Sequence, residues 1–274
     1  MDKRTLILGK GYIGERLQEA LRCPLSPKKI AGFSDVNSLL KKYKPRVVIN
    51  CIGHTGANNV DGCELAKDKT LFANTYVPLL LAEAAYRHKI KLVHISSGCI
   101  YHYAYGRSKP IEESLTPDYY DLYYSRTKIY AENALLELSK RADILLIRIR
   151  VPLDDRPHPK NILTKLLGFN RVLDVPNSVT YIPDFIKALR HLLKTGKKGI
   201  YNIALKGGLF YKDLLNAYNG RGRHHGFSLI KPKDLKMNRT NLILSVKKLE
   251  KSGFKVRKPK EIMEECVKGY LKRL

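Results

Sequence analysis

The sequence predicts an α/β fold, a doubly wound and mainly parallel sheet with a smaller C-terminal lobe. Apolar, strand-like segments alternate with segments of helical period, and this alternation is typical of βαβ units. A second observation is the pattern Gly9-Lys-Gly-Tyr-Ile-Gly14, which matches GxGxxG and lies directly between an expected strand and an expected helix. Together the two observations favour a nucleotide-binding α/β core.

The expected elements of the core alternate along the first half of the chain. Strands are expected at residues 5–8, 46–50, 91–95 and 144–151. Helices are expected at about residues 12–21, 34–43, 67–87 and 124–140. Ser34 and Asp35 are candidate N-caps of the second helix, because their side chains accept hydrogen bonds from free N–H groups. The last strand is expected to be buried on both faces.

The 274 residues suffice for one large domain, or for one domain with a smaller lobe. After Pro152 the character of the sequence changes, because shorter elements and more lysines follow. We expect residues 1–150 to form an NAD(P)-binding core and residues 151–274 to form mainly a substrate-binding lobe. Segments 180–186 and 199–203 are expected to return to the core.

Composition excludes several classes of protein. No apolar run approaches the roughly 20 residues that span a bilayer, and the first residues lead straight into a strand, so we expect no membrane anchor and no secretory signal. The five cysteines are an odd number and lack the spacing of metal ligands. We therefore expect free thiols, no metal and a reducing, cytoplasmic setting.

The net charge of +26 favours contact with anions in general. A lysine-rich surface that simply faces solvent is the favoured interpretation of this charge. No paired Cys/His spacing and no RRM-like aromatic run is found, so specific nucleic-acid binding stays a minor alternative.

The glycine pattern predicts a Rossmann-like cofactor loop. Its glycines permit a tight turn and a close approach of the backbone to a pyrophosphate, which faces the N-terminus of the following helix. An ordinary glycine turn is the alternative. The expected cofactor contacts in this loop are Gly9, Lys10, Gly11, Tyr12, Ile13 and Gly14.

The acidic residue that would bind the ribose of NAD is not cleanly placed. Asp35 lies near the expected distance of about 20 residues but also fits a helix cap. Cations lie nearby, at Arg22, Lys28, Lys29 and, within the glycine loop, Lys10. Because such charges suit a 2′-phosphate, we expect NADPH, with NADH possible.

Tyr124 and Lys128 are four residues apart on a predicted helix and therefore share one face. A nearby ammonium lowers the pKa of a phenol from about 10 and makes tyrosine a usable general acid. Tyr123 offers a competing register, and a surface Tyr/Lys pair is the alternative without function. The position downstream of the strand exit at Ser96-Ser97 favours a catalytic role.

The glycine loop, Ser97 and the Tyr124-x-x-x-Lys128 spacing together resemble the extended short-chain dehydrogenase/reductase family over nearly the whole chain. The resemblance implies that Ser97 and Tyr124 bind a substrate carbonyl oxygen, while Lys128 orients the nicotinamide ribose and tunes the tyrosine. It further implies that Asn74 supports the active site. Cys51 and Gly53 match the strand exit at which the family places its cofactor.

A narrower resemblance rests on seven segments: GHTGANNVDGCE (53–64), SSGCIY (96–101), YYSRTK (123–128), RVP (150–152), NILTK (161–165), VPNSVT (175–180) and RTN (239–241). They look like the UDP-4-keto-6-deoxyglucose 3,5-epimerase/4-reductases of UDP-rhamnose synthesis and, less closely, like the dTDP-4-dehydrorhamnose reductases. In these epimerases a cysteine and a lysine serve C3 and C5 epimerisation. The resemblance assigns those roles to Cys99 and Lys165.

The same resemblance implies substrate contacts by five polar residues of the second half: Asn161, Asn177, Thr180, Arg239 and Asn241. It implies a UDP- or dTDP-linked 4-keto-6-deoxy sugar as substrate, and a homodimer formed through the helices at about 67–87 and 124–140. We expect 3,5-epimerisation followed by 4-reduction. A 4-reductase in which Cys99 is a small packing residue, and a non-catalytic binding subunit, remain as alternatives.

Overall fold

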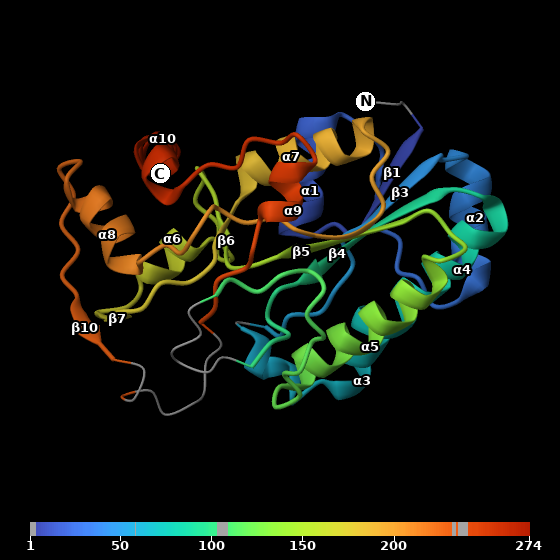
Figure 1. Cartoon of the computed structure of the whole chain (residues 1–274), viewed down its shortest axis with the longest axis horizontal. Coiled ribbons are helices and arrows are strands. Elements are labelled where there is room, and N and C mark those ends of the chain that lie inside the picture. Colours follow the sequence, from blue (N-terminus) through green and yellow to red (C-terminus); the bar gives the residue numbers. More distant parts are fainter. Residues whose placement is uncertain (1–3, 58, 103–108, 232–233, 235–240) are drawn as a thin grey trace. The chain divides into compact units, whose positions relative to one another are not determined.

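The computed structural model describes residues 4–57, 59–102, 109–231, 234 and 241–274 of the chain (Figure 1). The chain folds into two compact units. Unit 1 holds residues 1–101, 116–148 and 193–201, and unit 2 holds residues 102–115, 149–192 and 202–274. The chain thus passes between the units more than once. As a division into cofactor and substrate functions, the boundary expected at residue 150 stays a prediction.

Unit 1 is built around a six-stranded sheet of order β2-β1-β3-β4-β5-β9. Its strands are β1 (Thr5–Leu8), β2 (Leu25–Ser26), β3 (Val47–Asn50), β4 (Lys91–Ser97), β5 (Ile144–Ile149) and β9 (Gly199–Asn202). β1 pairs in parallel with both β2 and β3, and β3 pairs in parallel with β4. The direction in which strands are added reverses at β1 and β3, and ligands of doubly wound sheets bind at the carboxyl ends of the strands beside such a point. The predicted α/β fold is confirmed.

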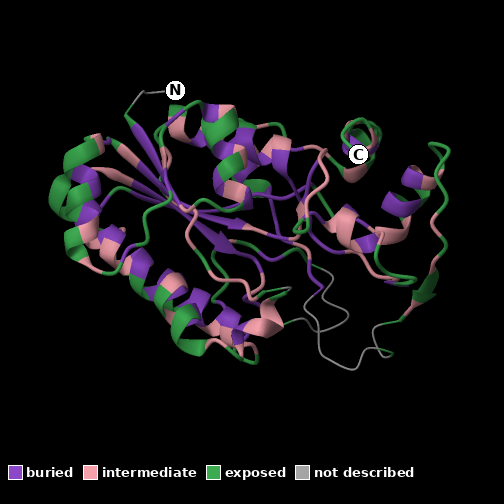
Figure 2. Cartoon of the chain, turned by 180° about the vertical axis from the view of Figure 1, so that it is seen from behind, coloured by how far each residue is buried: buried purple, intermediate pink, exposed green. Residues whose placement is uncertain are grey.

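The helical segments of unit 1 are α1 (Tyr12–Leu21), α2 (Phe33–Tyr43), η1 (Val60–Cys63), α3 (Lys67–Leu71), η2 (Phe72–Tyr76), α4 (Val77–His88) and α5 (Tyr123–Leu138). One hydrophobic cluster joins the inner faces of α2, α4 and α5 to alternate residues of the strands, such as Leu6 and Leu8 of β1. Ile7 lies between them and is also fully buried, so both faces of β1 are covered. Buried residues dominate the strands of this sheet (Figure 2).

Two predicted helices differ from the expectation in detail. The helix expected at 67–87 is continuous, but its middle turn, η2, has π-helical hydrogen bonding. The second helix begins at Phe33 with Gly32 as its N-cap, so Ser34 and Asp35 lie inside its first turn and are not the cap. From within this turn the Asp35 carboxylate accepts the N–H of Ala31, which lies before the helix.

Unit 2 contains the remaining helices and strands. They are β6 (Pro152–Leu153), α6 (Ile162–Leu166), β7 (Arg171–Leu173), β8 (Thr180–Tyr181), α7 (Ile182–Lys194, whose last two residues belong to unit 1), α8 (Tyr211–Asn219), β10 (Ser228–Ile230), α9 (Lys247–Lys251) and α10 (Pro259–Leu271). β6 pairs with β8 and β7 pairs with β10, both in parallel. A second hydrophobic cluster packs α6, α8 and α10 together. Among the described residues, no helix combines the length and the apolar character that crossing a membrane requires.

Candidate active site

The glycine loop connects β1 to α1 and lies against the residues that follow β3. Gly9 has a φ of +99°, and a Cβ at this position would be 2.8 Å from the backbone of Cys51 and of Ile52. A Cβ at Gly14 would overlap the carbonyl oxygen of Gly9. Gly11 is exposed, extended and the N-cap of α1, with open space around its Cα. The loop therefore needs two glycines for its own shape, while Gly11 leaves the helix N-terminus open to a ligand.

The side chains around this loop set its charge. Lys10 is exposed, Ile13 is half-buried and Tyr12 is buried. Asp35 forms an ion pair of 2.9 Å with Lys28 and accepts the N–H of Ala31 at 2.8 Å.

The hydrogen bond from Lys28 is the main reason that the pKa of Asp35 is lowered. Its carboxylate is thus already engaged within the chain. The exposed cations Arg22 and Lys29 lie outside this pair.

Asn74 links the exit of β3 to helix α5. It lies fully buried in η2, and π-helical turns are frequent at functional sites. Its amide accepts the N–H of His54 at 2.8 Å and donates to the His54 carbonyl at 3.0 Å and to Thr127 Oγ1 at 3.2 Å. The neighbouring Thr75 donates to the Thr127 carbonyl at 2.8 Å. Asn74 therefore holds the backbone after Gly53 in place.

Tyr124 and Lys128 are one turn apart in α5, and both are buried. A Cβ built on Gly53 would lie 3.4 Å from Lys128 Nζ and 3.3 Å from Asn74 Oδ1, so the ammonium lies beside the strand exit. Burial lowers the pKa of Lys128 to about 8, against the opposing influence of Glu132. The predicted Tyr124/Lys128 pair is therefore buried. The alternative of a surface pair without function does not hold.

Ser97 and Cys99 form a turn at the end of β4. Ser97 is buried, and its Oγ accepts the backbone N–H of Cys99 at 3.1 Å. Ser125 donates to the carbonyl of Cys99 at 2.6 Å, which fixes this turn to the residue after Tyr124. Cys99 is half-buried, whereas Cys23, Cys63 and Cys266 are buried. Unit 1 therefore brings the segments that carry Ser97, Cys99 and Tyr124 together.

A buried charged network lies one turn beyond Lys128, and sequence reasoning missed it. Glu132 accepts hydrogen bonds from Ser96 Oγ at 2.5 Å and from Arg148, and Arg148 also donates to the hydroxyl of Tyr101 at 2.6 Å. Glu132 and Arg148 are both fully buried. The network ties α5 to β4 and β5, and so fixes the helix that carries Tyr124.

A second missed feature is the pair of Asn50 and His94 on neighbouring strands. The Asn50 amide donates to His94 Nδ1 at 3.0 Å, and its oxygen accepts the N–H of Ile52. Burial, followed by the charge of Lys128, holds the pKa of His94 well below its ordinary value. A neutral histidine adds no further positive charge beside the Lys128 ammonium. Polar residues within an otherwise apolar strand were the signal that could have revealed both features.

In unit 2, Asn161 and Thr180 have their polar atoms engaged with the backbone. Asn161 caps α6 and bonds to Asp154 N, Asp154 O and Arg156 O at 2.7–3.2 Å. Thr180 Oγ1 donates to the Ile203 carbonyl at 2.6 Å and accepts the N–H of Arg150 at 2.9 Å. Both residues therefore shape the backbone of this unit.

Asn177 is the centre of a buried polar cluster. Its oxygen accepts Arg150 Nε at 2.8 Å, and its amide nitrogen donates to the hydroxyl of Tyr211 at 3.0 Å and to Asn241 Oδ1 at 3.5 Å. Asn241 is buried, and its Nδ2 has no hydrogen-bond partner among the described residues. Arg239, another predicted substrate contact, lies outside the described residues.

Lys165 is half-buried in the short helix α6 of unit 2. Burial, followed by the charge of Lys160, lowers its pKa. The lysine is therefore closer to a usable base at neutral pH than an ordinary surface lysine.

Comparison with known proteins gives the family. The model of the RmlD substrate binding domain matches residues 6–175. The chain is 29% identical over 226 residues to the trifunctional UDP-glucose 4,6-dehydratase/UDP-4-keto-6-deoxy-D-glucose 3,5-epimerase/UDP-4-keto-L-rhamnose-reductase RHM1 of Arabidopsis thaliana, covering 78% of this chain and 33% of RHM1. It thus spans about a third of the length of such a trifunctional relative. It is 30% identical over 224 residues to the bifunctional dTDP-4-dehydrorhamnose 3,5-epimerase/dTDP-4-dehydrorhamnose reductase of the same plant, covering 78% of this chain and 73% of that protein.

Solved structures agree on the fold. The L780 UDP-rhamnose synthase of Acanthamoeba polyphaga mimivirus has a TM-score of 0.87 at 23% identity, covering 97% of this chain and 99% of that one. The dTDP-4-dehydrorhamnose reductase of Bacillus anthracis, solved with NADP, has a TM-score of 0.81 at 18% identity, covering 99% of both. The resemblance inferred from the sequence motifs is therefore confirmed at the level of the family. The chain belongs to the RmlD substrate binding domain family.

Proposed function

We propose that this chain uses NADPH to reduce the C4 ketone of a nucleotide-linked 4-keto-6-deoxy sugar, after epimerising C3 and C5 of the same sugar. The observation that carries the reductase proposal is the position of Lys128. Its ammonium is buried beside Gly53, one turn from Tyr124, at the carboxyl ends of parallel strands. That is where doubly wound folds bind a dinucleotide.

The residues of unit 1 fit such a cofactor. The glycine loop leaves the N-terminus of α1 open at Gly11, where backbone N–H groups and the helix dipole favour a pyrophosphate. Lys10, Arg22 and Lys29 supply exposed positive charge for a 2′-phosphate, and Asp35 is engaged by Lys28. When bound, NADPH supplies a hydride to C4 of the sugar.

The chain's own side chains would supply the proton and hold the oxygen. The hydroxyls of Ser97 and Tyr124 donate hydrogen bonds to the C4 oxygen, where negative charge develops during reduction. Tyr124 then transfers its proton to this oxygen, which yields the C4 alcohol. The Lys128 ammonium would bind the ribose hydroxyls of the cofactor and would attract the negative charge that develops on the Tyr124 oxygen as its proton leaves.

Epimerisation would use the same oxygen contacts. The C4 carbonyl acidifies the protons on C3 and C5, so that a base can remove one of them to give an enolate held by Ser97 and Tyr124. Inversion needs a proton donor on the opposite face of the ring, and we assign the two roles to Cys99 and Lys165. Support comes from the half-buried positions of both side chains and from the lowered pKa of Lys165. The chain covers 73% of the bifunctional plant relative, whose name includes both an epimerase and a reductase activity.

The predicted substrate contacts of unit 2 divide into two kinds. We propose that Asn161 and Thr180 act through the backbone that they hold, and that Asn177 and Asn241 lie closer to the nucleotide. The substrate class is a UDP- or dTDP-linked 4-keto-6-deoxy sugar. A homodimer through α5 and through the continuous helix made of α3, η2 and α4 stays a prediction.

The test is to incubate the protein with UDP-4-keto-6-deoxyglucose and NADPH in D2O and to examine the product by NMR. Deuterium at C3 and C5 together with the rhamnose configuration would support both activities. Reduction without deuterium would leave a plain 4-reductase and assign Cys99 to packing. Absence of any turnover with either the UDP or the dTDP sugar would contradict the proposal.

A further inference from the structure

One face of the C-terminal helix α10 contacts the segment that carries Lys165. Cys266, Gly269 and Tyr270 lie on this face, and Arg273 lies two residues beyond the last residue of the helix. Their spacing of three, one and three residues places them on one stripe of a helix. Each of them contacts a residue between Asp154 and Thr164, as the following bonds show.

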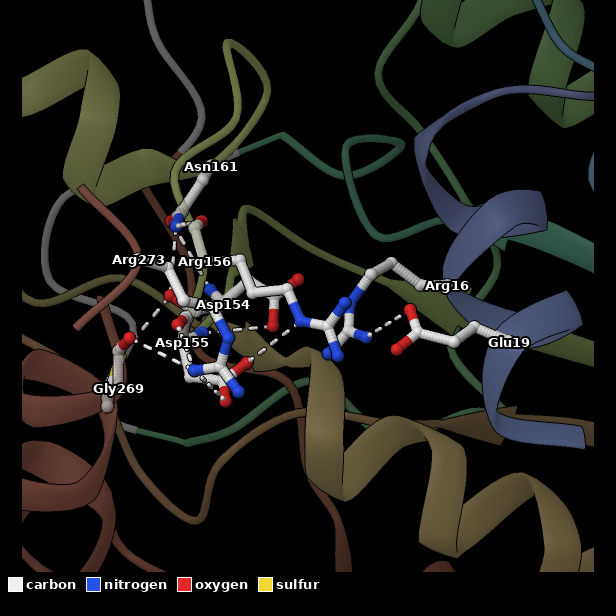
Figure 3. A network of polar contacts seen from close by, with 9 residues as sticks. Arg16, Glu19, Asp154, Asp155, Arg156, Asn161, Gly269 and Arg273 are labelled. Atoms are coloured by element: carbon white, nitrogen blue, oxygen red, sulfur yellow. Dashed lines mark hydrogen bonds and ion pairs between the residues drawn. The ribbon is translucent and has the colours of Figure 1, made fainter. Parts of the chain in front are cut away.

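The first contacts are to the loop before α6. The buried thiol of Cys266 donates to the carbonyl of Asp154 at 3.6 Å, and burial raises its pKa, so the thiol keeps its proton. Arg273 Nη1 donates to the Asp155 carbonyl at 3.2 Å and to the Gly269 carbonyl at 3.0 Å, and also pairs with the Asp155 carboxylate at 3.3 Å. Figure 3 shows Arg273 beside Asp155 of this loop and Gly269 of the helix.

Gly269 explains how closely the helix approaches the loop. A glycine within a helix is less favourable than an alanine, so its presence needs a reason. A Cβ at this position would lie 2.9 Å from Asp155 Cβ and 3.3 Å from the Asp155 carbonyl oxygen. Any larger residue would therefore push α10 away from the loop.

The last contact reaches α6 itself. The hydroxyls of Tyr270 and Thr164 share a hydrogen bond of 2.8 Å, and Thr164 Oγ1 also accepts the N–H of His158 at 3.2 Å. Thr164 immediately precedes Lys165, and α6 is only five residues long. So short a helix is not stable alone and takes its position from its contacts. The other end of α6 is held by Asn161, whose bonds to Asp154 and Arg156 lie in the same network (Figure 3).

We propose that α10 is the positioning element of Lys165, and that the Tyr270–Thr164 hydrogen bond sets the orientation of α6 for epimerisation. This inference rests on the proposed role of Lys165 as an epimerisation acid or base. It assigns no role to α10 in reduction, because Ser97, Tyr124 and Lys128 all belong to unit 1. Tyr270 is thus a positioning residue that acts on one of the two reactions.

The test compares Tyr270→Phe with the control Tyr218→Phe. The ring of Tyr218 packs edge-to-face against Tyr270 at 6.5 Å, but the bond to Thr164 comes from Tyr270. Both changes remove one hydroxyl from the same hydrophobic cluster and keep its packing. Deuterium entry at C3 and C5 in D2O reports epimerisation, and NADPH oxidation with the already epimerised UDP-4-keto-rhamnose reports reduction.

We expect Tyr270→Phe to slow deuterium entry about tenfold, as misplacement of a reacting group does, with NADPH oxidation within about twofold of the unmodified protein. Thr164→Val should behave in the same way, and Thr164→Ser, which keeps a hydroxyl, should retain most of the exchange. Tyr218→Phe should leave both rates unchanged.

A second readout does not depend on activity. Reductive methylation with ¹³C-formaldehyde gives each lysine an NMR signal, and Lys165→Arg identifies that of Lys165. In Tyr270→Phe the pKa read from this signal should rise toward that of an exposed lysine.

Equal loss of exchange and reduction in Tyr270→Phe, or no loss beyond that of Tyr218→Phe, would overturn the inference. If the unmodified protein reduced the sugar without deuterium entry, the proposed epimerase function itself would fail, and the inference with it.

Discussion

Arg148 and Glu132 form a bidentate ion pair that is closed off from solvent on all sides. Arg148 Nε lies 3.1 and 3.0 Å from the two carboxylate oxygens, and Nη2 lies 2.6 Å from one of them. Because desolvation of two charges is costly, such a pair adds little net stability, but loss of one partner leaves the other charge buried and unpaired. The pair connects β5 to the helix that presents Tyr124 and Lys128.

We therefore predict that Glu132→Gln lowers the free energy of unfolding by about 3 kcal/mol. The matched control is Glu137→Gln on the same helix, where the pair with Lys140 is exposed and a change below about 0.5 kcal/mol is expected. Urea denaturation of both variants measures the difference. Equal effects of the two changes would show that the buried pair does not anchor α5.

Lys128 makes a prediction about pH. Burial lowers its pKa from 10.5 to about 8, so in this pH range the unfolded chain binds more protons than the folded protein. The contribution of Lys128 to stability therefore improves as the pH rises from 8 to 10.5. We expect the melting temperature of the protein, relative to that of Lys128→Met, to rise across this range. Parallel pH profiles for the two proteins would contradict the lowered pKa.

A substitution at Gly11 should affect cofactor binding without affecting the stability of the loop. A Cβ at Gly11 would meet no atom of the described part of the chain within 4 Å, and the same holds for Gly32 at the N-cap of α2. We predict that Gly11→Ala melts like the unmodified protein but binds NADPH at least about tenfold more weakly, since the added methyl stands where the backbone approaches the pyrophosphate. Gly32→Ala should not alter binding. Calorimetric titration with NADPH gives both affinities, and unchanged affinity in Gly11→Ala would place the cofactor elsewhere.

Cys99 tests the epimerase proposal separately from the reductase proposal. Cys99→Ala should lower deuterium entry at C3 and C5 by about a hundredfold, the usual contribution of a general acid or base. NADPH oxidation with the already epimerised sugar should change little. Cys23→Ala, at a buried cysteine of unit 1, is the control and should leave both rates unchanged. Full deuterium entry in Cys99→Ala would show that Cys99 has only a packing role.

The features that sequence predicts best here depend on short-range patterns. The glycine loop, the strand exit before Ser97 and the Tyr124/Lys128 spacing each lie within a few residues and follow local geometry. The π-helical turn at Asn74 was not predictable in this way. The side chain of Asn74 bonds to His54 and Thr127, which lie far from it in the sequence. Apolar periodicity in residues 67–87 is the same for an α-helix and for one with a π-turn.

Buried polar residues were the harder case. In the sequence, Glu132 fits an exposed face of a helix and Arg148 fits a strand. Both side chains can be buried because they pair with each other across 16 residues of sequence. The resemblance implies that Asn161 and Thr180 contact substrate, and in the structure their polar atoms also hold the backbone of unit 2. A polar residue in a motif can serve either purpose, and only its hydrogen-bond partners distinguish them.

The central claim is that Tyr124, one turn from the buried ammonium of Lys128, protonates the oxygen of a C4 ketone while NADPH supplies the hydride. The most direct measurement is a single turnover of UDP-4-keto-6-deoxyglucose with NADPH deuterated at the transferred position, followed by NMR of the sugar. The account predicts deuterium at C4 in the unmodified protein and a loss of at least about a hundredfold in its rate in Tyr124→Phe, with Tyr123→Phe close to the unmodified protein. Undiminished transfer in Tyr124→Phe, or no deuterium at C4 in the unmodified protein, would contradict it.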